Sequence, residues 1–165
     1  AAAGSCDYIR ETVHRYNPDA RIVESIHQPR CFIPLTEWYV NIASQGIDIA
    51  KMRGKRIMAV SAIGNPASFE QTISDIGAVI IESLRYPDHH DYAMSEMTDI
   101  FQQAENAGAE AIVITEKDAV KIPAAVAREK WSIPIYVICV EVNFQKGSEG
   151  LSEMLQKRLA ERFGH

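Results

Sequence analysis

The sequence predicts an α/β fold, a three-layer α/β/α sandwich around a mostly parallel sheet, with an N-terminal linker segment that contains a small hairpin. Apolar runs at 57–62, 79–84 and 111–114 alternate with amphipathic segments, as in strands joined by crossover helices. The run at 134–140 is apolar at nearly every position, which is typical of a strand covered on both faces. A polar cluster follows each of the first three runs, at the sheet edge where ligands bind in such folds.

The first 27 residues predict one helix and one strand. Apolar residues at helical spacing indicate a helix over 8–16, which Asn17-Pro18-Asp19 ends, and a strand follows at 20–26. Two elements are too few to form a core. We therefore interpret 1–27 as the remnant of a preceding lobe.

Residues 28–56 have a different character, because Pro29 and Pro34 interrupt them. A short strand is expected at 38–40, and Gln45-Gly46 predicts a turn before 47–49. We interpret 28–56 as a linker with a small hairpin.

Residues 57–165 are expected to form one α/β/α lobe. After the first strand a helix begins at about Pro66, with Asn65 as its N-cap. Further helices are expected at 95–107, 117–121 and 149–162, the first of them ended by Gly108.

Composition excludes several classes of protein. The chain has 165 residues, of which 47% are hydrophobic and 24% charged, with a net charge of −5. These values fit a globular domain, and an acidic chain offers no basic surface for nucleic acid. No apolar run reaches the roughly 18 residues that span a bilayer. Three widely spaced cysteines without a CxxC pair predict free thiols in the cytoplasm, and no zinc site.

The segment Asp88-His89-His90-Asp91 is the sharpest local signal. A carboxylate beside an imidazole orients its tautomer and makes it a better base. The same groups are acceptable metal ligands, although one tripeptide supplies too few for a site. The alternative is a polar turn stabilised by an aspartate.

Two further clusters predict contacts with a phosphorylated ligand. In Thr115-Glu116-Lys117-Asp118, a capping box explains Thr115 and Asp118, but not Lys117 and Lys121, which lie four residues apart. Gly64 and Asn65 stand where a strand turns into a helix, whose first amides can bind an anion. A purely structural turn is an equally good reading. The chain contains neither a G-x-x-x-x-G-K-[ST] nor a G-x-G-x-x-G motif for nucleotide phosphates.

Three segments together carry a family resemblance: Ala62-Ile63-Gly64-Asn65-Pro66-x-x-Phe69, Tyr86-Pro87-Asp88-His89-His90-x-Tyr92 and Thr115-Glu116-Lys117-Asp118-Ala119-Val120-Lys121. In this order and spacing they resemble the C-terminal lobe of the tetraacyldisaccharide 4'-kinase family of lipid A biosynthesis. The resemblance implies two α/β/α lobes joined by a two-stranded linker, with the active site between them. It implies ATP and Mg²⁺ as cofactors of the full-length enzyme, and transfer of the γ-phosphoryl group to the 4'-hydroxyl of a lipid A disaccharide precursor.

The resemblance also assigns site residues. His89 would pair with an aspartate of the P-loop lobe as the catalytic base, and Asp88 would orient it. Gly64, Asn65, Glu116, Lys117, Asp118 and Lys121 would contact nucleotide or substrate, and no residue of this chain would bind the metal. The missing P-loop lobe would be the partner, and it would carry the membrane association at the cytoplasmic face of the inner membrane.

Without that lobe, this chain is expected to be inactive alone. Two other readings stay open. One is a non-catalytic α/β binding module whose polar loops are caps and turns. The other is a metal-dependent phosphoesterase of the type named after its Asp-His-His tripeptide, for which only Asp75 and Asp118 could supply further carboxylates.

Overall fold

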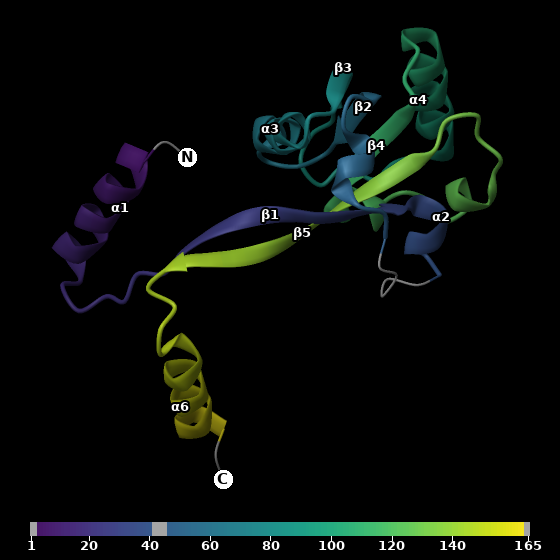
Figure 1. Cartoon of the computed structure of the whole chain (residues 1–165). Helices are drawn as coiled ribbons and strands as arrows, with labels where there is room; N and C mark the ends of the chain where they lie inside the picture. Colours follow the sequence, from purple (N-terminus) through teal and green to yellow (C-terminus); the bar gives the residue numbers. More distant parts are fainter. Residues whose placement is uncertain (1–2, 41–45, 164–165) are drawn as a thin grey trace. The chain divides into compact units, whose positions relative to one another are not determined.

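The computed structural model describes residues 3–40 and 46–163 and confirms the α/β fold around a mostly parallel sheet. Its elements, in chain order, are α1 (Ala3–Tyr16), β1 (Glu24–Pro34), α2 (Leu35–Trp38), the 3-10 helix η1 (Ile49–Met52), β2 (Arg56–Ser61), α3 (Pro66–Ile76), β3 (Val79–Arg85), α4 (Met94–Ala107), β4 (Ala111–Thr115), α5 (Glu116–Ala119), the 3-10 helix η2 (Val126–Arg128), β5 (Ile135–Lys146) and α6 (Leu151–Phe163) (Figure 1).

The chain divides into two compact units. Residues 29–141 form one, which holds most of the sheet and is called the sheet unit below. Residues 1–28 and 142–165 form the other, called the terminal unit. Of the expected linker 28–56, all residues but Gln28 thus group with the sheet, and the segment after 141 groups with the N-terminal helix. Their assignment to lobes of a longer enzyme stays a prediction.

The sheet has the strand order β1-β5-β4-β2-β3. Strand β2 pairs in parallel with both β3 and β4, and β4 pairs in parallel with β5. From β2 the chain goes to β3 on one side, and then crosses to β4 on the other. The carboxyl ends of β2 and β4 therefore form a topological switch point, where the following loops diverge.

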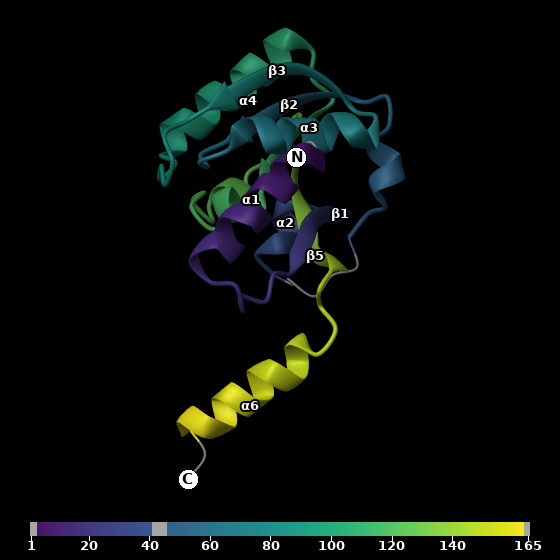
Figure 2. The ribbon, with the colours of Figure 1, turned by 90° about the vertical axis from the view of Figure 1, so that its left-hand side faces the viewer.

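Two cores cover the two faces of the sheet, because alternate strand residues point to opposite sides. Ile57 and Ala59 of β2 pack with α3, whereas Met58 and Val60 pack with α4. Figures 1 and 2 show α3 and α4 on opposite sides of the strands. This arrangement is the predicted three-layer sandwich.

Local signals set the helix ends as the sequence predicted. Pro66 opens α3, and the Asn65 side chain accepts a hydrogen bond from the Ser68 amide at 3.2 Å. Helix α4 ends at Gly108, whose φ of 71° is left-handed and favours glycine.

The N-terminal part differs from the expectation. The predicted strand at 38–40 was wrong, since α2 occupies Leu35–Trp38 and buries Trp38. Strand β1 begins at Glu24 and continues to Pro34, because its second half is buried in the sheet despite the prolines. Strand β5 likewise runs beyond the predicted 140, to Lys146.

The structure does not show the hairpin predicted from 38–40 and 47–49. Residue Ile47 instead forms one antiparallel bridge with Phe32 of β1, in which the two residues exchange backbone hydrogen bonds of 3.0 and 2.7 Å. Gly46 precedes it with a φ of 65°, and a Cβ there would lie 2.8 Å from the Phe32 carbonyl oxygen. Gln45, the other half of the predicted turn, lies outside the described residues. Of the described helices, none combines the length and the apolar character needed to cross a bilayer.

Candidate functional site

His89 stands in the loop after β3, at the carboxyl edge of the sheet. Its φ is 66°, the only positive value among the non-glycine residues described. Two acceptors hold its amide in this conformation, the Ala62 carbonyl at 3.3 Å and Asp88 Oδ1 at 3.1 Å. The imidazole is 86% exposed, with Nε2 at 3.7 Å from Asp88 Oδ2. A strained backbone that presents an unburied imidazole is typical of functional loops.

The β2–α3 loop lies directly against this carboxylate. A Cβ added to Gly64 would be 3.5 Å from Asp88 Oδ2. The Tyr86 amide also donates to the Ser61 carbonyl at 2.8 Å, which joins the two loops at their bases. The structure therefore brings Gly64, Asp88 and His89 together, as the sequence predicted from adjacent strand ends.

His90 has a different environment from His89. Its ring stacks on Tyr86 at a centroid distance of 4.8 Å and meets Tyr92 edge-on at 5.2 Å. Its Nε2 lies 3.0 Å from a Glu96 oxygen. Glu96 also accepts the Ala93 amide at 2.7 Å, and this bond, with a smaller effect of His90, holds the pKa of Glu96 below its usual value. His90 is thus held by packing with 25% of its side chain exposed, whereas 86% of the His89 side chain is exposed.

The side chains of Asp88, His89 and His90 are not grouped as ligands of one metal ion would be. In the part of the chain that the structure describes, no three His, Cys, Asp or Glu side chains are grouped to hold a metal ion. Asp118, one of the two extra carboxylates considered for a phosphoesterase, is instead surrounded by hydrogen-bond donors.

Asp118 is fully buried beneath the switch point. Its Oδ1 accepts the Ala62 amide at 2.8 Å and the Tyr92 hydroxyl at 3.1 Å. Its Oδ2 accepts the Thr115 hydroxyl at 2.6 Å and the Thr115 amide at 3.4 Å. The capping box predicted for Thr115 and Asp118 is confirmed. The carboxylate, however, is turned inward, so the structure gives no support to the predicted ligand contact.

The other predicted ligand residues lie around this edge. Asn65 and Lys117 are exposed, and Lys121 is half-buried. Glu116 Oε2 accepts the Val140 amide at 3.3 Å and so reaches the neighbouring strand. The helix predicted at 117–121 is the shorter α5, and Lys121 follows it in a turn whose amide donates to the Asp118 carbonyl at 2.9 Å. The ligand contacts expected of these four residues stay predictions.

Two tyrosines that were not among the predicted site residues lie against Asp118 and the turn of Lys121. The Tyr92 hydroxyl reaches Asp118, and both burial and the nearby Asp118 charge raise the pKa of Tyr92. The Tyr39 hydroxyl faces the Ala119 carbonyl at 2.8 Å and the Ile122 carbonyl, on either side of Lys121. Tyr92 carries a sequence signal, since it closes the motif Tyr-Pro-Asp-His-His-x-Tyr, but Tyr39 has no local signal.

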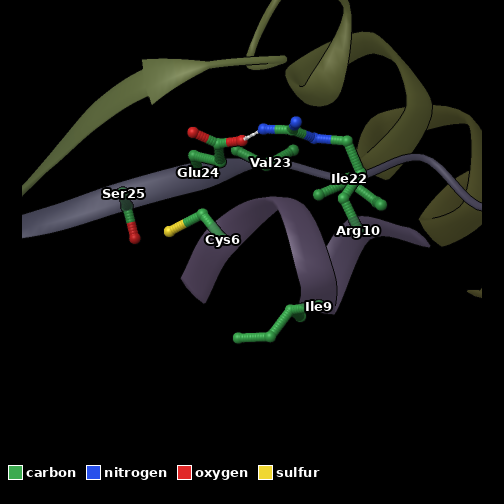
Figure 3. Close-up of a pocket in the computed structure, with 7 residues that line it drawn as sticks. All are labelled: Cys6, Ile9, Arg10, Ile22, Val23, Glu24 and Ser25. Carbon is green, nitrogen blue, oxygen red and sulfur yellow. Dashed lines mark hydrogen bonds and ion pairs between the residues drawn. The ribbon is translucent and has the colours of Figure 1, made fainter. Parts of the chain in front are cut away.

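The terminal unit contains a separate open hollow of about 270 Å³ between α1 and residues 22–25, which include the start of β1 (Figure 3). Arg10 and Glu24 form an ion pair across its wall. None of the predicted site residues lines this hollow, whose lining is Cys6, Ile9, Arg10, Ile22, Val23, Glu24 and Ser25.

The fold and the site define a doubly wound α/β protein with polar groups gathered at the carboxyl ends of its strands. Residues 9–160 match the family model described as LpxK, tetraacyldisaccharide-1-P 4'-kinase. The chain belongs to this family.

Curated relatives with the name tetraacyldisaccharide 4'-kinase agree. The protein of Syntrophus aciditrophicus is 37% identical over 79% of this chain and 33% of its own length. That of Anaeromyxobacter sp. strain K is 30% identical over 84% of this chain and 35% of its own. This chain therefore spans about a third of the length of such relatives. A solved structure, the "apo" form of LpxK from Aquifex aeolicus in complex with ATP, is 16% identical, with a TM-score of 0.48 over 87% of this chain and 40% of that one.

Proposed function

We propose that this chain is the C-terminal part of an ATP-dependent lipid kinase that phosphorylates the 4'-hydroxyl of tetraacyldisaccharide 1-phosphate in lipid A biosynthesis. Family membership supports the reaction class. The observation that carries the assignment of the site is His89, an exposed imidazole on a left-handed backbone beside Asp88.

In this proposal His89 acts as the base, together with an aspartate from the rest of the enzyme. The proton of the 4'-hydroxyl passes to this pair while the hydroxyl oxygen bonds to the γ-phosphorus. The bond from that phosphorus to the bridging oxygen breaks, and ADP leaves. Asp88 would orient the ring and pair with it once it is protonated, since its Oδ2 lies 3.7 Å from His89 Nε2.

The remaining groups at this edge would meet phosphate or sugar. Lys117 and Lys121 supply positive charge, and Gly64 and Asn65 stand at the start of α3, where the helix dipole favours an anion. Glu116 would accept hydrogen bonds from sugar hydroxyls.

The rest of the kinase would supply what this chain lacks. ATP phosphates and Mg²⁺ would be held by a P-loop lobe, since no P-loop motif occurs in these residues. That lobe is the partner we propose, and through it the enzyme would associate with the cytoplasmic face of the inner membrane. Exposed apolar side chains on α1 and α6 fit such a partner, among them Ile9, Val13, Leu155 and Leu159.

A chimaera tests the proposal. This chain replaces the matching segment of the Syntrophus aciditrophicus relative, and transfer of ³²P from ATP to the disaccharide 1-phosphate is measured with Mg²⁺ present. We expect activity from the chimaera and none from the chain alone. His89→Ala should lower the rate by about 10²-fold or more, as for loss of a general base. His90→Ala is the matched control and should retain far more activity.

Two results would contradict the proposal. A folded chimaera that binds ATP but transfers no phosphate would favour the non-catalytic binding module. Equal rates for the parent chimaera and its His89→Ala variant would remove the catalytic assignment while leaving the kinase reading intact.

A further inference from the structure

The Asp118 carboxyl group is buried where no ligand reaches it, so it needs a role other than ligand binding. Its side chain is 0% exposed. Burying a carboxylate is costly unless hydrogen bonds compensate for the lost water. Here four donors do so, and they come from three different segments of the chain.

We propose that Asp118 is a positioning residue that sets the backbone of His89 and couples the three loops of the site. The proposal rests on the function proposed for His89. It replaces the ligand contact that the sequence predicted for Asp118, and it assigns the residue no contact with substrate.

The first connection runs through a single residue, Ala62. The Ala62 amide donates to Asp118 Oδ1 at 2.8 Å, and the Ala62 carbonyl accepts the His89 amide at 3.3 Å. Asp118 therefore fixes the end of β2, and the end of β2 in turn holds the left-handed turn at His89. A strained φ persists only where its surroundings impose it.

The second connection runs through the Tyr92 ring. Its hydroxyl donates to Asp118 Oδ1 at 3.1 Å, and the ring meets Tyr86 and His90 edge-on at 5.3 and 5.2 Å. Tyr86 and Tyr92 are thereby placed on either side of the segment that carries Asp88 and His89. The contacts of Tyr92 thus hold the end of the β3–α4 loop, and the Ala62 carbonyl holds the same loop at His89.

The third connection is the capping box. Asp118 Oδ2 accepts both the hydroxyl and the amide of Thr115, at 2.6 and 3.4 Å. The turn that carries Lys117 and Lys121 starts from this pair. One carboxylate thus sets the relation between the imidazole and the two lysines.

The geometry requires a carboxylate and not an amide. Oδ1 faces the backbone N–H of Ala62, and Oδ2 faces the backbone N–H of Thr115. Asparagine must direct its NH₂ group at one of these two donors, because it has a single acceptor oxygen. Asp118→Asn should therefore break one connection while it preserves volume.

The first test follows the connection itself in the 165-residue chain. In ¹H–¹⁵N spectra, Asp118→Asn should shift the Ala62 and His89 amide signals and speed hydrogen exchange at His89. Glu110→Gln is the matched control, because Glu110 Oε2 accepts the Arg56 amide at 2.9 Å, at the opposite end of β2. This control should shift Arg56 and leave His89 unchanged.

The second test measures catalysis in the chimaera described above. Asp118→Asn should lower kcat by about 10- to 100-fold with little change in KM for ATP, since it displaces a reacting group without touching the nucleotide. Glu110→Gln should keep kcat within about twofold, as for a surface change. Should Asp118→Asn fail to fold, Tyr92→Phe removes one donor only and should shift the same His89 signal less.

The outcomes separate this inference from the proposed function. Unchanged His89 signals and unchanged kcat in both folded Asp118→Asn and folded Tyr92→Phe would overturn the positioning role. A shifted His89 amide with a rate that does not depend on His89 would support the structural connection but remove the catalytic function on which the inference rests.

Discussion

Tyr92→Phe is the change that most directly measures how the buried carboxylate is held. It removes the hydroxyl that donates to Asp118 Oδ1 at 3.1 Å and leaves the aromatic ring in place. Tyr92 is 4% exposed, so water does not readily replace the lost donor. Asp118 keeps the Ala62 and Thr115 donors.

The size of the effect follows from the type of bond. A hydrogen bond to a charged acceptor contributes about 1.5–3 kcal/mol, and a buried acceptor that loses its partner is penalised further. Because three donors remain, we expect a loss of about 2 kcal/mol. With a urea dependence of about 2 kcal/mol per molar, the midpoint should fall by about 1 M.

Tryptophan fluorescence reports this loss selectively. Both tryptophans, Trp38 and Trp131, belong to the sheet unit, and Trp131 stacks on Phe101 at 3.8 Å. The matched control is Tyr86→Phe. Its ring stacks on His90, but its hydroxyl has no hydrogen bond to any part of the chain that the structure describes. The midpoint of this control should move by less than about 0.3 M.

The effect should also depend on pH in one direction. Burial, followed by the Asp118 charge, raises the pKa of Tyr92 above 10.0. Above pH 10 the Tyr92 hydroxyl of the unfolded chain ionises, whereas that of the folded chain stays protonated. The stabilisation of the folded state by this hydroxyl is therefore complete below pH 10 and is lost as the pH rises above it. The penalty of Tyr92→Phe should thus be largest near neutral pH. Equal midpoints for Tyr92→Phe and Tyr86→Phe at pH 7 would refute the reasoning.

Three further predictions concern single groups. His89→Gly should raise the stability of the sheet unit by up to about 1 kcal/mol in urea unfolding, because glycine relieves the strain of the positive φ. Phosphate transfer by the chimaera should be lost in the same variant. A lower stability would contradict the strain at His89. Glu96→Gln should lower the urea midpoint at pH 7, because the Ala93 amide holds the pKa of Glu96 below 4.5. The difference between the two proteins should vanish as the pH falls below about 4.5, where Glu96 takes up its proton. A difference that does not depend on pH would contradict this role of Glu96. Burial raises the pKa of Cys139 to about 12. At pH 8 iodoacetamide should therefore label Cys139 on the order of 10³-fold more slowly than a free thiol, as measured by peptide mass spectrometry. Labelling as fast as at Cys6 would argue against this prediction.

The sequence by itself determined the features that depend on short-range rules. The continuous apolar run 57–60 predicts a strand that is covered on both faces, and its successive side chains point to opposite cores. Asn65 and Gly108 set helix ends through their own side-chain and backbone chemistry. Parallel strands must end at a common edge, so the order of the apolar runs is enough to predict that the polar groups after them lie together. The same rule singles out the loop that carries His89.

Only the tertiary structure decided which of those polar groups are exposed at the site and which are buried beneath it. His89 and His90 are adjacent and chemically identical, yet one is exposed and the other packs between two tyrosines. Asp118 satisfies a local capping rule, but its second oxygen accepts an amide 56 residues away. The extension of β1 through Pro29 and Pro34 likewise follows from its place in the sheet. Each of these outcomes depends on hydrogen bonds and burial between segments remote in sequence, which no pattern of neighbouring residues records.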